Sequence, residues 1–232
     1  MESFYLYFLA IFPAAFILFY FLLNDKFKEP KKLIFYTFLY GVVMTFLVGV
    51  VKTIIYELGF DPNPFLEAFV DAALIEELGK FIVLYFFCSR FTEFNEPMDG
   101  IVYGTAVALS FAVYENLEYV FASDDYAMNY YTAYARALTA LPMHAFCGVI
   151  MGDFIGKHFF IGKEDRKNLY YAFLVPFLIH GAYNYPLMED DLHHIFSSIV
   201  LLVALIITII LHKQAVKRQE LKDFEHEKKN YR

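Results

Sequence analysis

Tryptophan is absent from this chain of 232 residues, and cysteine occurs only twice, at Cys88 and Cys147. Both cysteines lie in apolar stretches, and two cysteines so placed do not make a disulfide framework, so we expect them to be packing residues. Hydrophobic residues make up 59% of the chain, whereas soluble domains average roughly 45–50%. This composition excludes an ordinary soluble protein and predicts an integral membrane protein.

Several familiar catalytic motifs are also missing. There is no His-Glu-x-x-His sequence, which excludes the usual zinc-protease arrangement, and no Gly-x-Ser-x-Gly turn to present a serine nucleophile. Of the Gly-x-Gly-Asp element of membrane aspartyl proteases only Gly152-Asp153 is present, because Ile150 stands in place of the first glycine. The N-terminus has no basic region before its first apolar stretch, so we expect a retained helix there and not a cleaved signal peptide.

What the chain does have is a series of apolar segments of membrane-spanning length. A helix needs roughly 20 apolar residues to cross a bilayer, within a range of about 17–25. We expect an all-α bundle of about seven transmembrane helices over residues 1–212 and a charged cytoplasmic tail over residues 213–232. The predicted spans are Phe4–Leu23, Leu33–Val51, Phe65–Cys88, Met98–Ala122, Tyr134–Gly156, Leu169–Leu187 and Ile195–His212.

The distribution of charge orients this bundle. Sixteen of the 19 Lys and Arg residues fall in the loops after the first, third and fifth spans or in the C-terminal tail, and the opposite loops carry only Lys52. Lysine and arginine favour cytoplasmic loops, which predicts an outer N-terminus and a cytoplasmic C-terminus. The net charge of −7 gives no indication of nucleic-acid binding, because the acidic residues lie in loops or inside spans.

Glu76, Glu77 and Lys80 stand in the middle of the third predicted span. A charged side chain at that depth costs about 3 kcal/mol or more, so this group predicts a buried polar site. Helical spacing places Glu76 and Lys80 on one face, where they can pair, and turns Glu77 about 100° away. Two adjacent carboxylates in a low-dielectric site do not both ionise easily, which suits one of them to act as a base.

Three other spans place polar groups at about the same depth. Glu115 lies in the fourth span and His144 in the middle of the fifth, while His180 lies in the sixth with Asn184 one turn later on the same face. Each residue alone is compatible with simple interhelical hydrogen bonding. Their coincidence in depth, however, favours a single site built from four helices.

Glycines show which way the fifth span faces. They follow His144 at intervals of four residues, at Gly148, Gly152 and Gly156. Small residues at this spacing let helix backbones approach closely, so we expect His144 to face protein and not lipid. Gly100 and Gly104 make a similar face at the start of the fourth span.

The polar layer suits peptide-bond hydrolysis, which needs an activated water, a proton donor and a group that stabilises the oxyanion. One glutamate can act as the base while Lys80 keeps the other ionised, and a histidine or Asn184 can donate to the oxyanion. A carboxylate and two imidazoles can equally hold zinc with an open position for water. The residue types allow both chemistries.

These motifs resemble those of the PrsW family of bacterial intramembrane proteases, over residues 65–185. The family's Glu-Glu-x-x-Lys, its Phe-x-x-x-Glu and its two later histidines are matched by Glu76-Glu77-Leu78-Gly79-Lys80, Phe111-Ala112-Val113-Tyr114-Glu115, His144 and His180. The related CAAX prenyl endopeptidases and Abi proteins carry Glu-Glu-x-x-x-Arg and Phe-x-x-x-His, from which this chain departs. Their third motif, His-x-x-x-Asn/Asp, is matched by His180 and Asn184, but processing of prenylated proteins is the less favoured substrate class.

The resemblance implies a multi-pass enzyme of the bacterial cell membrane that cuts a membrane-anchored regulator of the anti-sigma-factor type within the bilayer. Family members have been described both as metalloproteases and as glutamic proteases. We favour glutamate-activated water without a metal, and keep zinc as the alternative. The residues expected to be catalytic are Glu76, Glu77, Lys80, Glu115, His144, His180 and Asn184. An ion-coupled transporter and a non-catalytic scaffold are the competing hypotheses, although the chain shows no convincing internal repeat of the kind many transporters have.

The other polar residues are not assigned to the catalytic set. Arg136 is expected to snorkel at the outer edge of the fifth span, and Asp153 and Glu118 to lie near span ends without a catalytic role. Asp71 and Glu67, in the outer part of the third span, can line a path for water. The tail is expected to be a solvated amphipathic helix that can contact anionic lipid.

Overall fold

The computed structural model describes residues 2–161, 166–189 and 195–230. These ranges are helical and contain no strand, as expected for apolar segments that must bond every backbone N–H and C=O internally. The elements are α1 (Glu2–Asn24), α2 (Lys31–Glu57), α3 (Pro64–Leu66), η1 (Glu67–Leu74), α4 (Ile75–Ile82), η2 (Val83–Phe87), η3 (Cys88–Arg90), α5 (Pro97–Val120), α6 (Tyr126–Leu138), α7 (Ala140–Phe160), α8 (Lys167–Met188) and α9 (Ile195–Asn230).

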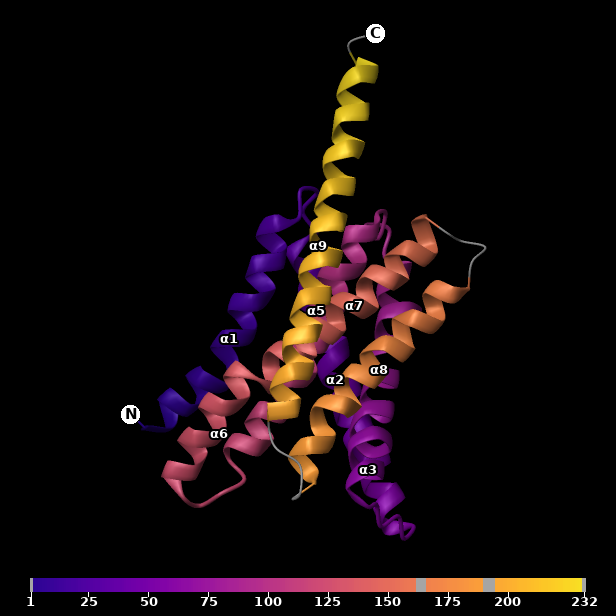
Figure 1. Ribbon diagram of the computed structural model, residues 1–232. Coiled ribbons are helices and arrows are strands. Elements are labelled where there is room, and N and C mark those ends of the chain that lie inside the picture. Colours follow the sequence, from indigo (N-terminus) through magenta and orange to yellow (C-terminus); the bar gives the residue numbers. More distant parts are fainter. Residues whose placement is uncertain (1, 162–165, 190–194, 231–232) are drawn as a thin grey trace.

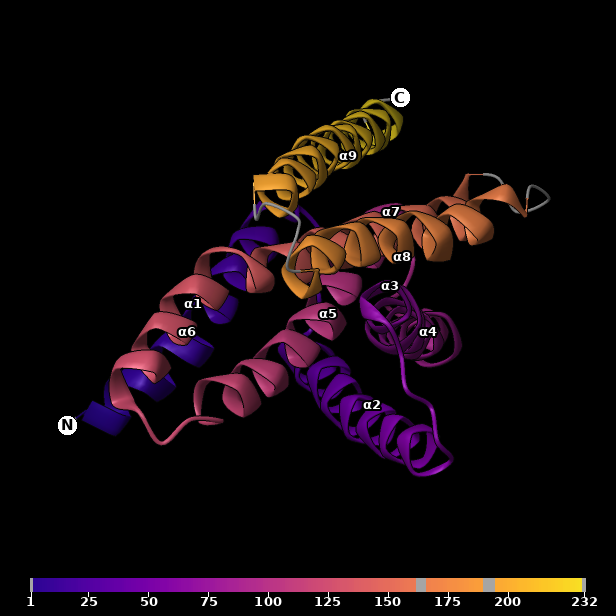
Figure 2. The ribbon, with the colours of Figure 1, turned by 60° about the horizontal axis from the view of Figure 1, so that its bottom comes forward.

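Helix α5 lies at the centre of the bundle and packs against α1, α2, α6, α7 and α9. The start of α1 and the end of α9 lie at opposite ends of the molecule (Figure 1). Figure 2 shows α5 between α1 and α6 on one side and α2 on the other, with α7 and α8 side by side. This arrangement brings the helices that carry the predicted site residues next to one another.

Four helical stretches are long and apolar enough to cross a membrane, namely Ser3–Asn24, Lys31–Glu57, Tyr126–Phe160 and Ile195–Leu221. The other long helical segments, α5, α8 and the composite helix through α4, carry most of the polar residues of the predicted site, and such residues lower a segment's hydropathy. The architecture fits seven spans. The span count, the orientation in the membrane and the domain boundary at residue 212 stay predictions.

The third predicted span is a single continuous helix with irregular winding. Its central turns, in α4, are α-helical, whereas η1 before them and η2 after them are π-helical. π-helical turns are rare and occur frequently at functional sites, because they change the direction in which successive side chains point. The segment with Glu76, Glu77 and Lys80 is thus bounded on both sides by altered helical winding.

The fifth predicted span, Tyr134–Gly156, contains a break in the helix that was not predicted. The helix breaks at Thr139, whose backbone angles (φ −128°, ψ −70°) are not helical, and this break separates α6 from α7. Helix α6 has 13 residues, which is too short to cross a bilayer. Arg136 lies on this separate helix.

The predicted close approach of the two glycine faces is confirmed. A methyl group added at Gly152 would overlap the carbonyl of Gly100, and one added at Gly148 would crowd the carbonyl of Gly104. Helices α5 and α7 therefore touch backbone to backbone, as small residues at intervals of four allow. This contact fixes the relative position of Glu115 and His144, which these two helices carry.

Helix α9 continues past the last predicted span and packs onto the bundle through the first turns of the tail. Gln219 donates to Asp25 across 2.7 Å and also to Glu96, while Arg218 pairs with Asp153 across 2.8 Å. Asp153 is fully buried and pairs also with Lys157 on its own helix. These contacts give Asp153 a structural role, as predicted.

Candidate active site

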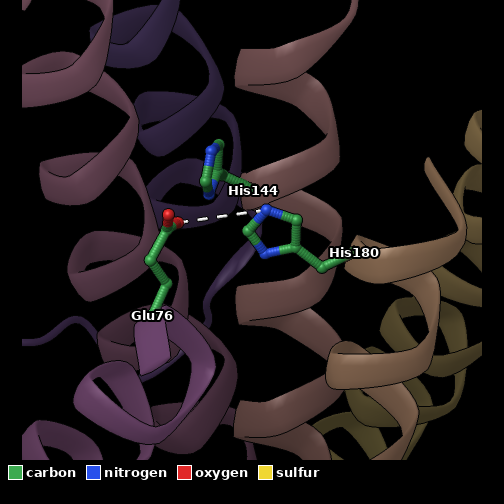
Figure 3. Close-up of side chains that lie close together, drawn as sticks. All are labelled: Glu76, His144 and His180. Carbon is green, nitrogen blue, oxygen red and sulfur yellow. Dashed lines mark ion pairs between the residues drawn. The ribbon is translucent and has the colours of Figure 1, made fainter. Parts of the chain in front are cut away.

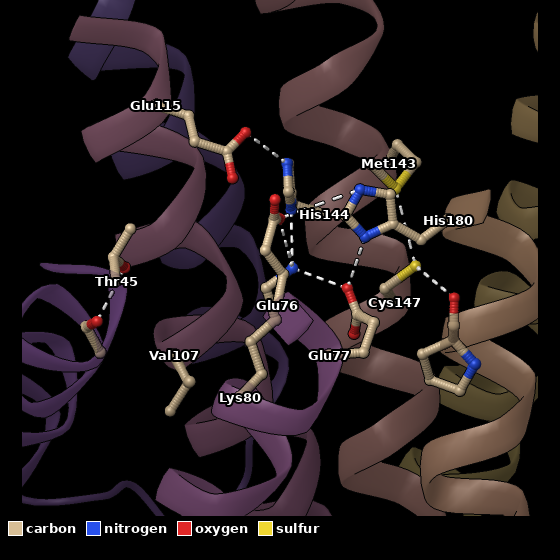
Figure 4. A network of polar contacts seen from close by, with 12 residues as sticks. Thr45, Glu76, Glu77, Lys80, Val107, Glu115, Met143, His144, Cys147 and His180 are labelled. Atoms are coloured by element: carbon tan, nitrogen blue, oxygen red, sulfur yellow. Dashed lines mark hydrogen bonds and ion pairs between the residues drawn. The ribbon is translucent and has the colours of Figure 1, made fainter. Parts of the chain in front are cut away.

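Helix α4 presents Glu76, Glu77 and Lys80 to the interior of the bundle. All three residues are buried, with exposed fractions of 5%, 0% and 1%. Gly79 lies on another face, where an added side chain would touch Met44, Val48 and Phe111. The absence of a side chain at position 79 lets α4 approach α2 and α5 closely, so its charged residues reach the same interior region as those of α5, α7 and α8 (Figure 4).

Lys80 pairs with Glu76, as its spacing predicted, but it lies closer to Glu77. The distance from Lys80 Nζ to Glu77 Oε1 is 2.6 Å, whereas the distance to Glu76 Oε2 is 3.9 Å. Positions three and four residues apart are both neighbours on a helix, so spacing alone does not choose between them. Here His180 decides, because its Nδ1 lies 2.8 Å from Glu77 Oε1 and fixes that carboxylate beside Lys80.

His144 connects Lys80 with Glu115. Its Nδ1 lies 2.9 Å from Lys80 Nζ and its Nε2 lies 3.2 Å from Glu115 Oε2. An ammonium can only donate and a carboxylate can only accept. His144 is therefore a neutral imidazole that accepts from Lys80 at Nδ1 and donates to Glu115 from Nε2.

His180 faces both glutamates of α4. Because Glu77 accepts a hydrogen bond from Nδ1, a neutral His180 has its lone pair on Nε2. That nitrogen lies 3.9 Å from Glu76 Oε2 (Figure 3). Glu76 Oε2 is buried and has no hydrogen-bond partner among the described residues. The His144 and His180 rings lie 5.1 Å apart and nearly perpendicular.

Lys52 also belongs to this network, although the sequence placed it in an outer loop. It lies within α2, and its Nζ is 2.9 Å from Glu76 Oε1 and 3.6 Å from Asp71 Oδ2. No motif marks this lysine. The only signal in the sequence is that it is the one basic residue assigned to the outer loops.

Arg136, which was expected only to snorkel at the outer edge of the fifth span, instead contacts three side chains of α5. Its Nη2 lies 3.1 Å from Glu115 Oε2, its Nε donates to Asn116 across 2.7 Å, and the guanidinium lies 4.2 Å above the Tyr119 ring. A planar guanidinium holds several partners in a fixed geometry, which explains why one arginine engages three neighbouring side chains of α5. Arg136 thereby ties α6 to the residue that His144 contacts.

Asn184 is the one predicted site residue that stays outside the network. It lies one turn beyond His180 on α8, is partly buried, and joins no hydrogen bond of the cluster within the described part of the chain. The remaining six predicted residues converge. Their catalytic roles stay proposals, because proximity alone does not assign a role.

Exposure differs between the outer and inner parts of the network. The side chains of Lys52, Asp71, Glu115 and Arg136 are 11–22% exposed, whereas those of Glu77, Lys80, His144 and His180 are 0–2% exposed. We call the first group the rim. Charged side chains inside a membrane face protein or water, and not lipid. We therefore expect water to reach the buried groups from the rim.

The donor atoms also fit a divalent metal ion. One atom from each of Glu76, His144 and His180 lies within 4.8 Å of the other two, and all three residues are buried. Two imidazoles and one carboxylate are the protein ligands of many catalytic zinc sites. The hydrogen bond from His180 Nδ1 to Glu77 is the outer contact that typically orients a metal-binding histidine.

Comparison with known proteins identifies the family. A family model described as PrsW family intramembrane metalloprotease matches residues 29–211. A relative named Protease PrsW from Geobacillus kaustophilus is 39% identical over 180 residues, which are 77% of this chain and 78% of the relative. Relatives of the same name from Oceanobacillus iheyensis and Bacillus subtilis are 36% and 33% identical, over 82% and 75% of this chain and 84% and 78% of their own. No solved structure matches the chain significantly.

These matches confirm the resemblance inferred from the motifs and extend it over most of the chain. They favour the peptidase hypothesis over the transporter. Together with the apolar helices they place the protein in a bacterial cell membrane, through which it passes more than once. The chain therefore belongs to the PrsW family of intramembrane proteases, and it is a membrane-embedded peptidase.

Proposed function

We propose that this peptidase is an endopeptidase that cuts a membrane-anchored regulatory protein of the anti-sigma-factor type, with Glu76 as the general base that activates water. The observation that carries this proposal is the free oxygen of Glu76. Its Oε2 is buried, lacks a hydrogen-bond partner among the described residues, and faces His180 Nε2. A general base needs such an acceptor within reach of the water it deprotonates.

Glu77 is assigned a supporting role. It is fully buried, and its Oε1 accepts from both Lys80 and His180, so it is held ionised between them. Its Oε2, like that of Glu76, has no hydrogen-bond partner among the described residues, and the two glutamates differ in which groups hold their Oε1. An ionised carboxylate at this position fixes the tautomer of His180 and neutralises Lys80. The two adjacent glutamates therefore have different functions, because their neighbours differ.

The proton transfers follow from this assignment. Glu76 takes a proton from water as the water attacks the peptide carbonyl, and returns it to the leaving amine when the C–N bond breaks. His144 donates through Nε2 to Glu115 and so stays neutral beside Lys80. Asn184 is proposed to donate to the oxyanion once a substrate lies against α8, which is the role of amide side chains in other oxyanion sites.

The metal-dependent form of the same protease is the second candidate, and it is favoured by one observation. Glu76, His144 and His180 together provide the donor set of a catalytic zinc site. When bound there, a zinc ion would lower the pKa of a bound water and polarise the substrate carbonyl. In this form Glu77 orients His180, whereas the ammonium of Lys80, which now occupies the lone pair of His144, would have to be displaced from it.

The family and the location of the site support this substrate class. Helices of the bundle enclose the polar cluster. A substrate must therefore pass from the membrane into the protein before its scissile bond can reach the cluster. A single-span regulatory protein satisfies this requirement, and release of its cytoplasmic part would produce a signal.

Cleavage of a single-span reporter tests the proposal. The reporter would carry the membrane segment of an anti-sigma factor and a cytoplasmic epitope tag, and would be co-expressed with the protease. Glu76→Gln and Glu77→Gln are expected to abolish release of the tagged fragment at unchanged protease abundance. Glu118→Gln is the matched control, because Glu118 lies on α5 one turn from Glu115 and is exposed. Full cleavage by both Glu76→Gln and Glu77→Gln would refute the proposal.

A further inference from the structure

We infer that Lys52 is a positioning residue of the active site: it holds Glu76 in the orientation that leaves one carboxylate oxygen free for water. This inference rests on the proposed role of Glu76. Lys52 lies on α2, outside every motif that identifies the site, and it reaches the cluster only because α2 packs against α4. Its Nζ donates to Glu76 Oε1 across 2.9 Å.

The geometry shows what this contact does. Glu76 has two cations nearby. Lys52 lies 2.9 Å from its Oε1, and Lys80 lies 3.9 Å from its Oε2. A carboxylate drawn fully to Lys80 would direct both oxygens into the Lys80–Glu77 pair and away from His180. Lys52 pulls Glu76 from the opposite side, so Oε2 remains unbonded and faces His180 Nε2.

Lys52 is itself held in place. Asp71 on η1 lies 3.6 Å from its Nζ and forms its second carboxylate contact. An ammonium inside a membrane segment needs such partners, because transfer of an unpaired charge into an apolar medium is costly. Lys52 connects Glu76 to the rim, whereas Lys80 and His180, on the other side of Glu76, are almost fully buried.

Charge balance supports the same conclusion. The described network contains four carboxylates, at Asp71, Glu76, Glu77 and Glu115, and three permanent cations, at Lys52, Lys80 and Arg136. Glu77 lies 2.6 Å from Lys80 and Glu115 lies 3.1 Å from Arg136, whereas Glu76 lies 3.9 Å from Lys80. Without Lys52, Glu76 would share Lys80 with Glu77, and the mutual repulsion of the two carboxylates would change their positions.

Substitution of Lys52 tests this role. With the reporter and the protease purified in detergent, Lys52→Met is expected to lower kcat at least tenfold and to leave KM within about twofold. A lower kcat at a nearly unchanged KM indicates the loss of an interaction that acts on the chemical step. Lys52→Arg preserves the positive charge and is expected to retain a substantial part of kcat. Lys32→Met is the matched control, because Lys32 is an exposed lysine on the same helix.

Chemical rescue separates positioning from simple folding. Lys52→Cys is expected to be as impaired as Lys52→Met. Treatment with 2-bromoethylamine converts the thiol to S-aminoethylcysteine, a close isostere of lysine, and is expected to restore activity at least fivefold. Iodoacetamide adds an uncharged amide and is expected to restore nothing. The two native cysteines are buried with 0% exposure, so the wild-type protein treated in parallel measures the background.

The possible outcomes distinguish this inference from the proposed function. If Glu76→Gln abolishes cleavage while Lys52→Met retains wild-type kcat, the role of Lys52 is refuted and that of Glu76 stands. If Glu76→Gln is fully active, the proposed function itself fails. If both reagents or neither restore activity to Lys52→Cys, Lys52 does not act through its charge and the positioning role is overturned.

Discussion

Lys80 lies 2.6 Å from Glu77 and 3.9 Å from Glu76, although both glutamates are within one helical turn of it. This unequal sharing divides an apparently symmetric Glu-Glu pair into a carboxylate held by Lys80 and His180 and one held by Lys52.

Glu77→Ala should destabilise the protein far more than Glu76→Ala. Removal of Glu77 leaves Lys80 buried without its nearest counter-charge, and breaking a buried ion pair in this way costs about 3–5 kcal/mol. Removal of Glu76 leaves Lys52 with Asp71 at the partly exposed rim, so the expected cost is smaller by about 2 kcal/mol or more. Thermal unfolding in detergent measures both variants.

The double variant Glu77→Ala, Lys80→Met provides the control for this stability prediction. Because it removes both charges, it should recover most of the stability that Glu77→Ala loses. Equal destabilisation by Glu76→Ala and Glu77→Ala would mean that Lys80 does not discriminate between the two glutamates.

Arg136→Met should reduce cleavage about tenfold or more, because it removes the guanidinium that holds Glu115 beside His144. Arg136→Lys should recover only part of the activity, since an ammonium cannot contact Glu115, Asn116 and the Tyr119 ring together. Arg90→Met serves as the control at an exposed arginine on η3. Normal cleavage by Arg136→Met would limit this residue to holding α6 in place.

Metal analysis decides between the two forms of the proposed mechanism. If Glu76 activates water alone, activity should survive chelation and the purified protein should contain well under one zinc per chain. If Glu76, His144 and His180 hold zinc, about one ion per chain should be present, and His180→Ala and Glu76→Gln should both lose it. Elemental analysis of the three proteins, combined with activity before and after chelation and zinc addition, measures this directly.

Asn184→Ala should lower kcat by about 10²–10³ if the amide donates to the oxyanion, because loss of one such donor has an effect of this size in other proteases. Stability should change little, since Asn184 joins no hydrogen bond of the cluster in the described residues. Asn184→Asp, which replaces the donor with a negative charge, should be at least as impaired. Wild-type kinetics for Asn184→Ala would remove it from the catalytic set.

Gly152→Leu should destabilise the protein by about 3 kcal/mol or more, because the new side chain would collide with the backbone of α5 at Gly100 and Ile101. Gly49→Leu is the matched control: an added Cβ at Gly49 on α2 meets no atom within 4 Å. Comparable unfolding temperatures for the two variants would contradict the close contact of α5 and α7.

The elements of the site that could be predicted are those fixed by helical periodicity. The glycine intervals predicted the contact between α5 and α7, and the structure confirms it. The depth of Glu76, Glu115, His144 and His180 in their spans predicted their convergence, which the hydrogen bonds and ion pairs bear out. In these cases the position of each side chain depends on the periodicity of the helix that carries it.

What could not be predicted depends on contacts between helices. The choice of Lys80 between its two glutamates depends on His180, which lies about a hundred residues later in the sequence. Lys52 and Arg136 have long side chains, so their charged ends lie far from their backbone positions, and neither stands in a recognisable motif. The break at Thr139 could have been found, because Pro142 has no N–H to donate to the carbonyl of Leu138 and is favoured in the first turn of a helix.

The glycine contact between α5 and α7 also limits how the enzyme can admit a polypeptide. Interlocking side chains can change rotamer and let helices slide, but two backbones in direct contact move as one rigid unit. The corresponding contacts of α4 and α8 are made by side chains, because Gly79 faces Met44 and Val48 and Gly181 faces the Phe69 ring. We therefore expect the α5–α7 unit to stay fixed during turnover, and the displacement that lets a substrate in to occur at α4 or α8.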